Sequence, residues 1–245
     1  MRKLLVAVIL LVSLSASTLA SVIVDPADYT GSRSTPPLSG VVGYDGWSND
    51  EGGFKVEWTI THELTGLWSY TYTFSDKNAL PPPNPDVSHW ILEVSPFITM
   101  DNMSNYFTFA DPSLVKGAEW WTADPNSPNS TSPGANKGNP NLPADLYGIK
   151  FDFTDSTYSF LSSQQPVWGD FYAKDGRHTD MVATVWNTGI GTDPVPGGSF
   201  INYIPTPDTL PGVFVPEPGT AVLAIGAVLA GAYARRRRRR AETER

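Results

Sequence analysis

The sequence predicts an all-β protein whose central part, residues 21–203, folds as an antiparallel β-sandwich with jelly-roll-like topology. Two observations predict this fold. Apolar and polar residues alternate with the period of two that is typical of half-buried strands, and helical periodicity is scarce. The alternating segments are short, and connections rich in Gly, Asp, Asn and Pro separate them, which is a pattern typical of sandwiches.

Two neighbouring segments show the alternation most clearly. Every second residue from Phe54 to Ile60 is apolar, and every second residue from Trp68 to Phe74 is aromatic. Five residues, 62–66, connect the two segments, so we expect a β-hairpin. Further strands are expected at His89–Val94, Tyr147–Phe153, Thr157–Leu161, Val167–Tyr172 and Met181–Trp186.

Two stretches of the central part have compositions that do not favour strands. Residues 124–143 are rich in Pro, Asn, Ser and Gly, so we expect a flexible insert there. Residues 204–215 are rich in proline and are expected to form a semi-rigid linker. Residues 200–204, which overlap the start of this linker, are a candidate for one final strand.

The first 20 residues have the pattern of a secretory signal peptide. Arg2 and Lys3 form a positive start, residues 4–14 are an almost unbroken apolar run, and small residues lead up to Ala20. We expect signal peptidase to cleave after Ala20. Cleavage after Ala16 and an uncleaved membrane anchor are the alternatives.

The C-terminal end has the pattern of a single membrane-spanning helix. Residues 220–234 are 15 uncharged, mostly apolar residues, and a helix of this length extends ~22 Å. By the positive-inside rule, the arginines that follow keep the tail, residues 241–245, in the cytoplasm and the centre of the chain outside. These stop-transfer residues are Arg235, Arg236, Arg237, Arg238, Arg239 and Arg240.

A proline-flanked glutamate stands directly before this helix. The segment consists of Val215, Pro216, Glu217, Pro218 and Gly219, and its two prolines favour an extended backbone that a membrane protease can bind. Pro-Glu-Pro, a short Gly/Ala/Leu-rich helix and an arginine cluster occur here in order. Over residues 216–240 the chain therefore resembles the PEP-CTERM sorting signal of Gram-negative and related bacteria. Five further residues follow the arginines, and they should not affect sorting.

This resemblance implies a route for the chain and a processing enzyme. Proteins with this signal are substrates of exosortases, membrane-embedded proteases that are thought to cut near Pro-Glu-Pro. The resemblance implies that the chain is exported, anchored transiently in the inner membrane, and then moved to the cell surface or the extracellular space. Family members commonly accompany exopolysaccharide production and biofilm formation. The alternative is an ordinary single-pass protein, whereas sortase and glycolipid-anchor signals do not fit these residues.

Charge and cysteine content exclude several function classes. The chain carries 17 basic and 25 acidic side chains and no cysteine. Residues 21–215 carry 8 basic and 22 acidic side chains, and a net charge of −14 would repel nucleic-acid phosphates. The lack of cysteine excludes disulfides, thiol catalysis and Cys-ligated metal centres.

No nucleophile motif or phosphate-binding loop is present, so we expect no catalytic residues and no enzymatic activity. Aromatic rings stack on sugars, and the candidates for sugar binding are Trp47, in an acidic loop, and the adjacent Trp120 and Trp121. In a strand, adjacent tryptophans face opposite ways, so one of this pair can be exposed. Calcium is a candidate ligand of acidic loops, with Asp45, Asp50 and Glu51 as one set and residues 170–180 as another; otherwise we expect no cofactor.

We therefore expect a structural or adhesive protein of the cell surface or extracellular matrix, with exopolysaccharide as a candidate partner. The alternative is a secreted carbohydrate-active enzyme or carbohydrate-binding module with the same sorting tail. Such an enzyme needs two carboxylates that face each other in a cleft, and Glu93 with Glu119 is the candidate pair.

Overall fold

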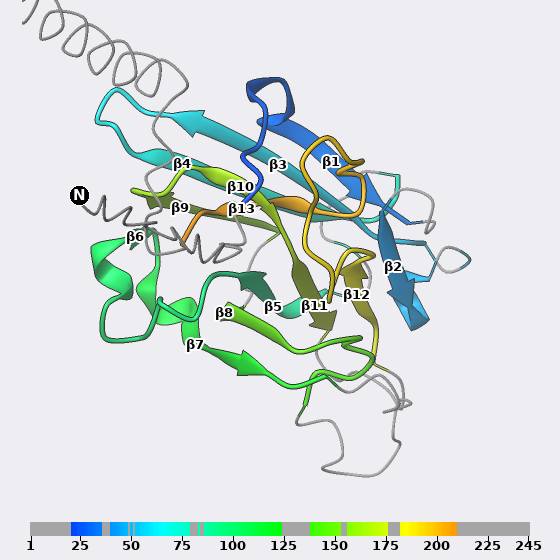
Figure 1. Ribbon diagram of the computed structural model, residues 1–245. Coiled ribbons are helices and arrows are strands. Elements are labelled where there is room, and N and C mark those ends of the chain that lie inside the picture. Colours follow the sequence, from blue (N-terminus) through cyan, green and yellow to red (C-terminus); the bar gives the residue numbers. More distant parts are fainter. Residues whose placement is uncertain are drawn as a thin grey trace, which may run out of the picture. The chain divides into compact units, whose positions relative to one another are not determined.

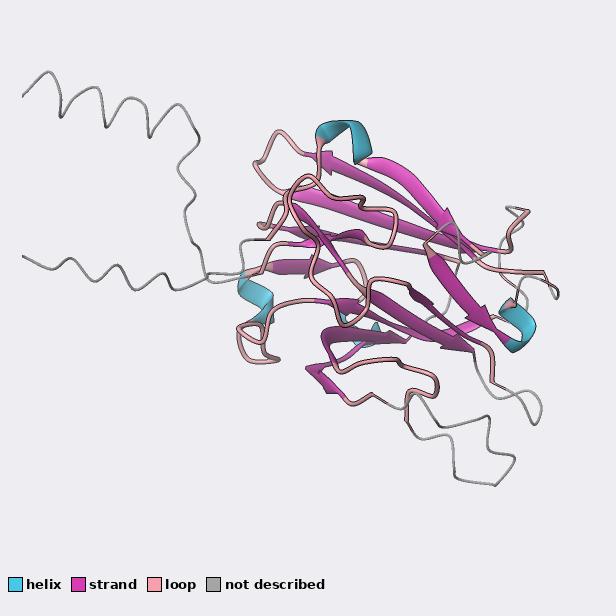
Figure 2. Cartoon of the chain, turned by 45° about the vertical axis from the view of Figure 1, so that its right-hand side comes forward, coloured by secondary structure: helices cyan, strands magenta, loops and turns pink. Residues whose placement is uncertain are grey.

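The computed structural model describes residues 21–35, 40–48, 50, 52–78, 83, 86–123, 138–152, 156–175 and 182–209. This part of the chain is all-β, and its strands pair antiparallel, which confirms the predicted fold class (Figures 1 and 2). The predicted signal peptide, most of the insert and the whole region from residue 210 onward lie outside the described residues.

The described strands form three sheets. The five-stranded sheet has the order β1-β3-β4-β9-β6, the six-stranded sheet has the order β2-β12-β11-β5-β8-β7, and β10 pairs with β13. The bounds are β1 Thr30–Ser34, β2 Val41–Tyr44, β3 Lys55–His62, β4 Trp68–Ser75, β5 Val87–Glu93, β6 Phe107–Phe109, β7 Val115–Trp121, β8 Leu146–Asp152, β9 Thr157–Ser162, β10 Pro166–Gly169, β11 Phe171–Asp175, β12 Thr184–Asn187 and β13 Ile204–Pro207.

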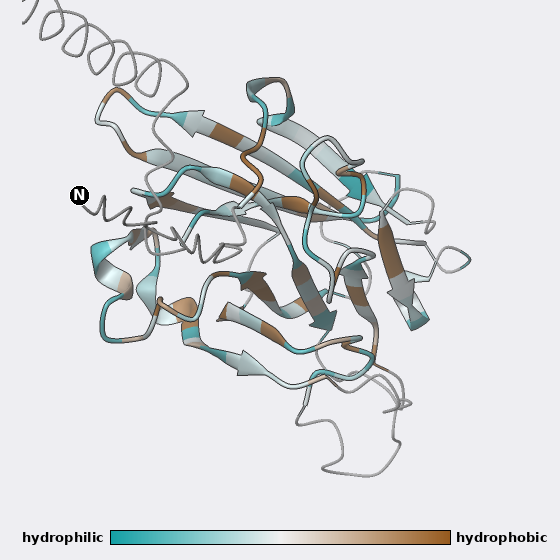
Figure 3. Cartoon of the chain, in the orientation of Figure 1, coloured by the Kyte–Doolittle hydropathy of each residue, from teal (hydrophilic) through white to brown (hydrophobic). Residues whose placement is uncertain are grey.

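An aromatic core fills the space between the five-stranded and six-stranded sheets. Trp90 of β5 is fully buried, and its ring centre lies 5.1 Å from that of Tyr72 and 5.3 Å from that of Phe74, both on β4. Figure 3 shows that strongly hydrophobic residues are concentrated on strands such as β2, β5 and β11. The packing of two sheets through such side chains is what makes this part of the chain a sandwich.

The predicted hairpin is present. Strands β3 and β4 pair along their whole length, from Lys55 opposite Ser75 to His62 opposite Trp68. The alternate apolar residues of both strands point into the core, as the period of two requires.

One predicted strand is divided between two sheets. Residues 167–172 were expected to form a single strand, but β10 ends at Gly169 and β11 begins at Phe171. The break at Asp170 lets β10 pair with β13, whereas β11 pairs with β5 and β12. Asp170 therefore lies where the chain passes from one sheet to the other.

The structure differs from the sequence-based expectation at the start of the proline-rich linker. Residues 204–207 form the buried strand β13 rather than a linker, with Pro205 opposite Trp168 and Pro207 opposite Pro166. Proline has no backbone N–H to donate to a neighbouring strand. It is therefore tolerated in an edge strand, which pairs with another strand on one side only. In the described residues β13 has a partner strand on one side, β10.

The helices in the described residues are short 3₁₀ turns, and none of them is long and apolar enough to cross a membrane. The predicted membrane-spanning helix, residues 220–234, falls outside these residues and stays a prediction. The turns are η1 Pro26–Asp28, η3 Asp45–Trp47, η4 Met103–Asn105 and η5 Pro112–Leu114.

Candidate functional site

A cleft of about 500 Å³ opens beside the break between β10 and β11. Four carboxylates line it, and they come from four places in the chain: Glu93 ends β5, Asp170 lies between β10 and β11, Asp193 follows β12, and Asp208 follows β13. Ser21 also lines the cleft. None of the residues described as lining it is a lysine, arginine or histidine.

Hydrogen bonds hold the deepest two carboxylates in place. The backbone N–H of Asp170 donates to Oε2 of Glu93 over 2.7 Å. The side-chain amide of Asn187 donates to Oδ1 of Asp170 over 2.5 Å, while its oxygen accepts from the N–H of Phe171 over 2.7 Å. The ends of β5, β11 and β12 are thus joined through polar side chains, which fixes the geometry of the cleft wall.

The two carboxylates perturb one another. Burial raises the pKa of Glu93 to about 7, against the lowering effect of the hydrogen bond from Asp170, and the charge of Asp193 raises it further. Burial, followed by the charge of Glu93, raises the pKa of Asp170 well above its ordinary value. A carboxyl group that keeps its proton near neutral pH can donate it, and an ionised pair can bind a cation.

The candidate pair of the sequence analysis, Glu93 and Glu119, shares one face of the six-stranded sheet. Both residues lie opposite Gly148 of β8, Glu93 from one side and Glu119 from the other. Two strand spacings place their backbones ~10 Å apart. The carboxylate of Glu93 binds the backbone of Asp170, however, and Glu119 is exposed outside the cleft. The neighbour of Glu93 in the cleft is therefore Asp170.

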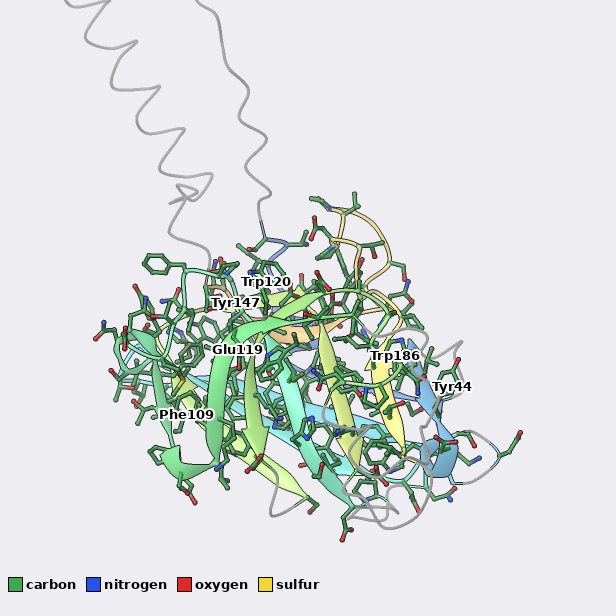
Figure 4. The ribbon with its side chains drawn as sticks, turned by 90° about the horizontal axis from the view of Figure 1, so that it is seen from below. Tyr44, Phe109, Glu119, Trp120, Tyr147 and Trp186 are labelled. Atoms are coloured by element: carbon green, nitrogen blue, oxygen red, sulfur yellow. The ribbon has the colours of Figure 1, made fainter. Side chains whose placement is uncertain are left out.

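A second candidate site is an exposed aromatic ledge on the edge strand β7. The side chain of Trp120 is 59% exposed and meets the ring of Tyr147 edge-on, with 5.4 Å between ring centres. The hydroxyl of Tyr147 donates to the carbonyl oxygens of Ile98 and Ala118, which fixes its ring. Figure 4 shows Trp120 beside Tyr147. An exposed indole on a fixed support is suited to stacking on a flat sugar face.

The rings of the other two candidate tryptophans are less accessible to a sugar ligand than the ring of Trp120. Trp121 is half-buried, with its indole N–H donating to the carbonyl of Gly148 and the ammonium of Lys150 5.2 Å from its ring centre. Trp47 is fully buried against Phe54 and therefore offers no face to a sugar in this structure. Of the three candidates, Trp120 presents its ring to solvent.

A further exposed aromatic residue lies at the opposite edge of the six-stranded sheet. Tyr44 of β2 is 48% exposed and stacks on Trp186 of β12, with ring centres 5.2 Å apart. Figure 4 shows this pair toward the opposite edge of the sheet from Trp120. Five strand spacings, ~24 Å, separate the two edge strands.

The structure describes part of the two candidate calcium-binding sets, and calcium binding stays a prediction. Asp45 begins the turn η3 with a positive φ of 53°, Asp50 is exposed, and Glu51 lies outside the described residues. Nowhere in the part of the chain that the structure describes do three His, Cys, Asp or Glu side chains come close enough to hold a metal ion.

Sequence reasoning did not bring together the residues of the cleft. Ser21, Glu93, Asp170 and Asp208 are separated by long stretches of chain, and no local motif links them. The turn residues Gly169 and Asp170 inside a strand-like segment were the one available signal, since glycine in a strand often marks a bend. The sorting residues 215–219, the arginines 235–240 and Ala20 all lie outside the described residues.

Comparisons with known proteins identify one segment of the chain. Residues 214–239 match a family model described as the PEP-CTERM protein-sorting motif, which confirms the resemblance seen in the sequence. No curated protein and no solved structure matches the chain.

Proposed function

We propose that this chain, which carries the PEP-CTERM protein-sorting motif at residues 214–239, is an exported structural or adhesive protein of the cell surface or extracellular matrix. The motif supports exosortase-dependent export and implies transit at a membrane. It is the single observation that carries the proposal. In this proposal exopolysaccharide is the surrounding material, and biofilm is the setting in which the β-sandwich works.

The proposed route includes two proteolytic cleavages, one near each end of the chain. Signal peptidase removes residues 1–20, and residues 220–234 then hold the chain in the inner membrane, with the arginines 235–240 on the cytoplasmic side. The exosortase binds the Pro-Glu-Pro segment around Glu217 and separates the ectodomain from the predicted helix. Replacing Glu217 and both flanking prolines by alanine should leave the tail attached, which intact mass spectrometry of the exported chain would show. Removal of the tail from this variant would rule out the motif as the recognition element.

For the ectodomain we propose binding to a polysaccharide through the ledge formed by Trp120 and Tyr147. Two features support this: the exposure of the Trp120 ring and the fixed orientation of Tyr147. Such binding needs no catalytic group and agrees with the absence of nucleophile motifs in the sequence.

The test is a glycan-binding assay of the exported chain, with and without calcium. Trp120→Ala should weaken binding by about fivefold to 150-fold, because stacking of a ring on an aromatic side chain contributes roughly 1–3 kcal/mol. Leu64→Ala is the matched control, because Leu64 is fully exposed but lies in the turn after β3. Equal binding by all three proteins would eliminate the ledge as the binding site.

The enzymatic alternative rests on one specific observation, the cleft. Glu93 and Asp170 line it together, and the pKa of Glu93 is raised to about 7, in the range of a general acid that works at neutral pH. In this alternative the chain is a carbohydrate-active enzyme with a sorting tail. Release of reducing ends from a polysaccharide by the wild-type chain, and not by Glu93→Gln, would favour it over the binding role.

A further inference from the structure

The described chain enters and leaves the β-sandwich at one place. Ser21 is the first residue after the predicted signal peptide, and its hydroxyl donates to Oδ1 of Asp208 over 3.1 Å. The next residue, Thr209, accepts a hydrogen bond from the backbone N–H of Ser95 over 2.5 Å. Ser21, Ser95 and Thr209 also line the same cleft. Since Ser95 comes two residues after the end of β5, both chain ends lie beside that end of the six-stranded sheet.

Both chain ends continue into segments that the sequence connects with a membrane. Ser21 follows the predicted signal peptide without a linker. At the other end, four residues, 210–213, separate Thr209 from the segment that matches the sorting motif, residues 214–239. A chain of this length spans at most about 18 Å when it is fully extended. The end of the sandwich that holds Ser21 and Thr209 therefore stays close to the membrane during the transit that the motif implies.

Large apolar side chains are exposed at this same end. Phe97 and Met100, in the segment that follows β5, are 44% and 56% exposed, and Trp120 is also exposed. Tyr147 connects that segment with β7, because its hydroxyl donates to the carbonyl of Ile98 over 2.6 Å while its ring contacts Trp120. Figure 4 shows Trp120 and Tyr147 together near one end of the strands. We call the surface formed by Phe97, Met100, Trp120 and Tyr147 the exit face.

Hydrogen bonds connect the exit face with the point where the chain leaves. The backbone N–H of Val94 donates to the carbonyl of Tyr147 over 3.1 Å. The next residue, Ser95, binds Thr209 through both its backbone N–H and its hydroxyl. Val195 is exposed as well, and it lines the same cleft as Ser95 and Thr209. The exposed aromatic and apolar groups thus lie beside the last described residues.

The charge around the exit face indicates the kind of surface that it fits. Asp101 and Asp193 are exposed, and no lysine or arginine occurs in the segments 93–106, 118–123 and 192–209. Anionic lipids attract basic segments, so they offer nothing to this surface. Trp and Tyr, by contrast, favour the boundary between headgroups and acyl chains. The exit face therefore has the chemistry of a surface that contacts a bilayer without net charge.

We propose that the exit face binds lipid, with the ring of Trp120 in the headgroup region of the inner membrane while the chain is anchored there. Trp120 also belongs to the proposed polysaccharide ledge, so the bilayer covers that ledge until the exosortase releases the ectodomain. Release then exposes the ring to sugars outside the cell. The masking of the ledge rests on the proposed function, whereas the lipid contact does not.

The test uses the full-length chain, exported by a strain without exosortase and held in nanodiscs of phosphatidylcholine. The chain has no cysteine, so a single introduced cysteine can carry a fluorescent label. Met100→Cys places the label on the exit face. Phosphatidylcholine that carries bromine on its acyl chains close to the headgroup quenches a fluorophore in that region. We expect strong quenching of the label at position 100.

Asn78→Cys is the matched control, since Asn78 is exposed in the turn after β4. The start of β4 lies toward the exit face, because the hydroxyl of Tyr70 donates to the carbonyl of Gln164 and the N–H of Asp208 donates to that of Gln165. The strand then extends eight residues, roughly 23 Å, before the turn. We expect no quenching of a label at position 78.

Two variants and a change of lipid test the nature of the contact. Trp120→Ala should lower the ratio of lipid-bound to free exit face about fivefold to tenfold, because about half of a large apolar side chain no longer leaves water. Tyr44→Ala removes an exposed ring from the opposite edge of the sheet and should change nothing. Phosphatidylglycerol should weaken the contact, and salt should restore it.

Equal quenching at both positions, or quenching at neither, would overturn the lipid contact. Two further results would also overturn it by identifying another partner. Quenching at position 100 that requires added exosortase would indicate the enzyme, and shielding of this label from water without quenching by bromine would indicate a second copy of the chain. Stronger contact with phosphatidylglycerol would contradict the role given to the apolar side chains.

Glycan binding tests the masking separately. The anchored chain should bind polysaccharide about tenfold more weakly than the released chain if the ledge is free in one-tenth of the anchored molecules. Equal binding by the two forms would overturn the masking. Binding by neither form would refute the polysaccharide ledge itself, while the quenching measurement would still decide the lipid contact.

Discussion

Replacing Glu93 by glutamine should stabilise the protein at alkaline pH and leave it unchanged in acid. The glutamine amide oxygen can still accept the hydrogen bond from the N–H of Asp170, so the change removes the charge and keeps the contact. In the wild-type chain, burial makes the folded state bind the proton of Glu93 more tightly than the unfolded chain does. Unfolding therefore releases protons between about pH 4.5 and pH 7, and stability falls as the pH rises through that window.

The magnitude follows from the two pKa values. A carboxyl group that titrates at 4.5 in the unfolded chain and at about 7 in the folded one lowers the free energy of unfolding by up to about 3 kcal/mol once both states are ionised. For a domain of this size each kcal/mol corresponds to roughly 2–4 °C in Tm. At pH 8, Glu93→Gln should therefore melt up to about 12 °C above wild type, and at pH 4 the two should melt together.

The assay is thermal unfolding followed by near-ultraviolet circular dichroism at pH 4, 6 and 8. Glu119→Gln is the control, since Glu119 is exposed on the same face of the sheet and should show no such pH dependence. A difference between Glu93→Gln and wild type that is the same at all three pH values would refute the reasoning.

Three further substitutions test the packing around the site by the same unfolding assay. Asn187→Ala leaves the buried N–H of Phe171 and the carboxylate of Asp170 without their shared partner, so it should cost roughly 2–4 kcal/mol; a cost below 1 kcal/mol would mean that the network does not support the junction. Trp90→Ala opens a cavity at the centre of the sandwich and should cost about 3–5 kcal/mol, whereas Trp120→Ala should cost less than about 1 kcal/mol; equal losses would contradict the assigned burial. Gly40→Ala should cost at least about 2 kcal/mol, because Gly40 has a φ of +84° and an added Cβ would lie 1.7 Å from the carbonyl oxygen of Ile201; unchanged stability would show that this turn has another conformation.

The parts of the fold that could be predicted are those specified by local alternation. The β3–β4 hairpin follows from a strict period of two on both sides of a short connection, and the opposite exposure of Trp120 and Trp121 follows from the same period. The break at Asp170 and the pairing of strand β13 could not be predicted, because both depend on the pairing of β10 with residues far along the chain, from Gly169 opposite Ile204 to Pro166 opposite Pro207. Local composition favoured one continuous strand in the first case and a linker in the second.

The candidate site was less accessible to prediction than the fold. The sequence does not distinguish a buried tryptophan from an exposed one. The tertiary packing shows that Trp47 is buried and Trp120 is exposed. The cleft is lined by four carboxylates that the sheet topology brings from four separate places in the chain, together with Ser21, the first residue after the predicted signal peptide. By contrast, the sorting motif is readable directly, because its three elements follow one another along the chain and need no tertiary contact.

The measurement that tests the central proposal most directly is the intact mass of the exported chain from otherwise identical strains with and without the exosortase. The proposal predicts a chain that begins at Ser21 in both strains and loses the residues after the Pro216–Pro218 region only when the exosortase is present. The same mass in both strains, with the tail retained, would contradict it and identify an ordinary membrane-anchored protein.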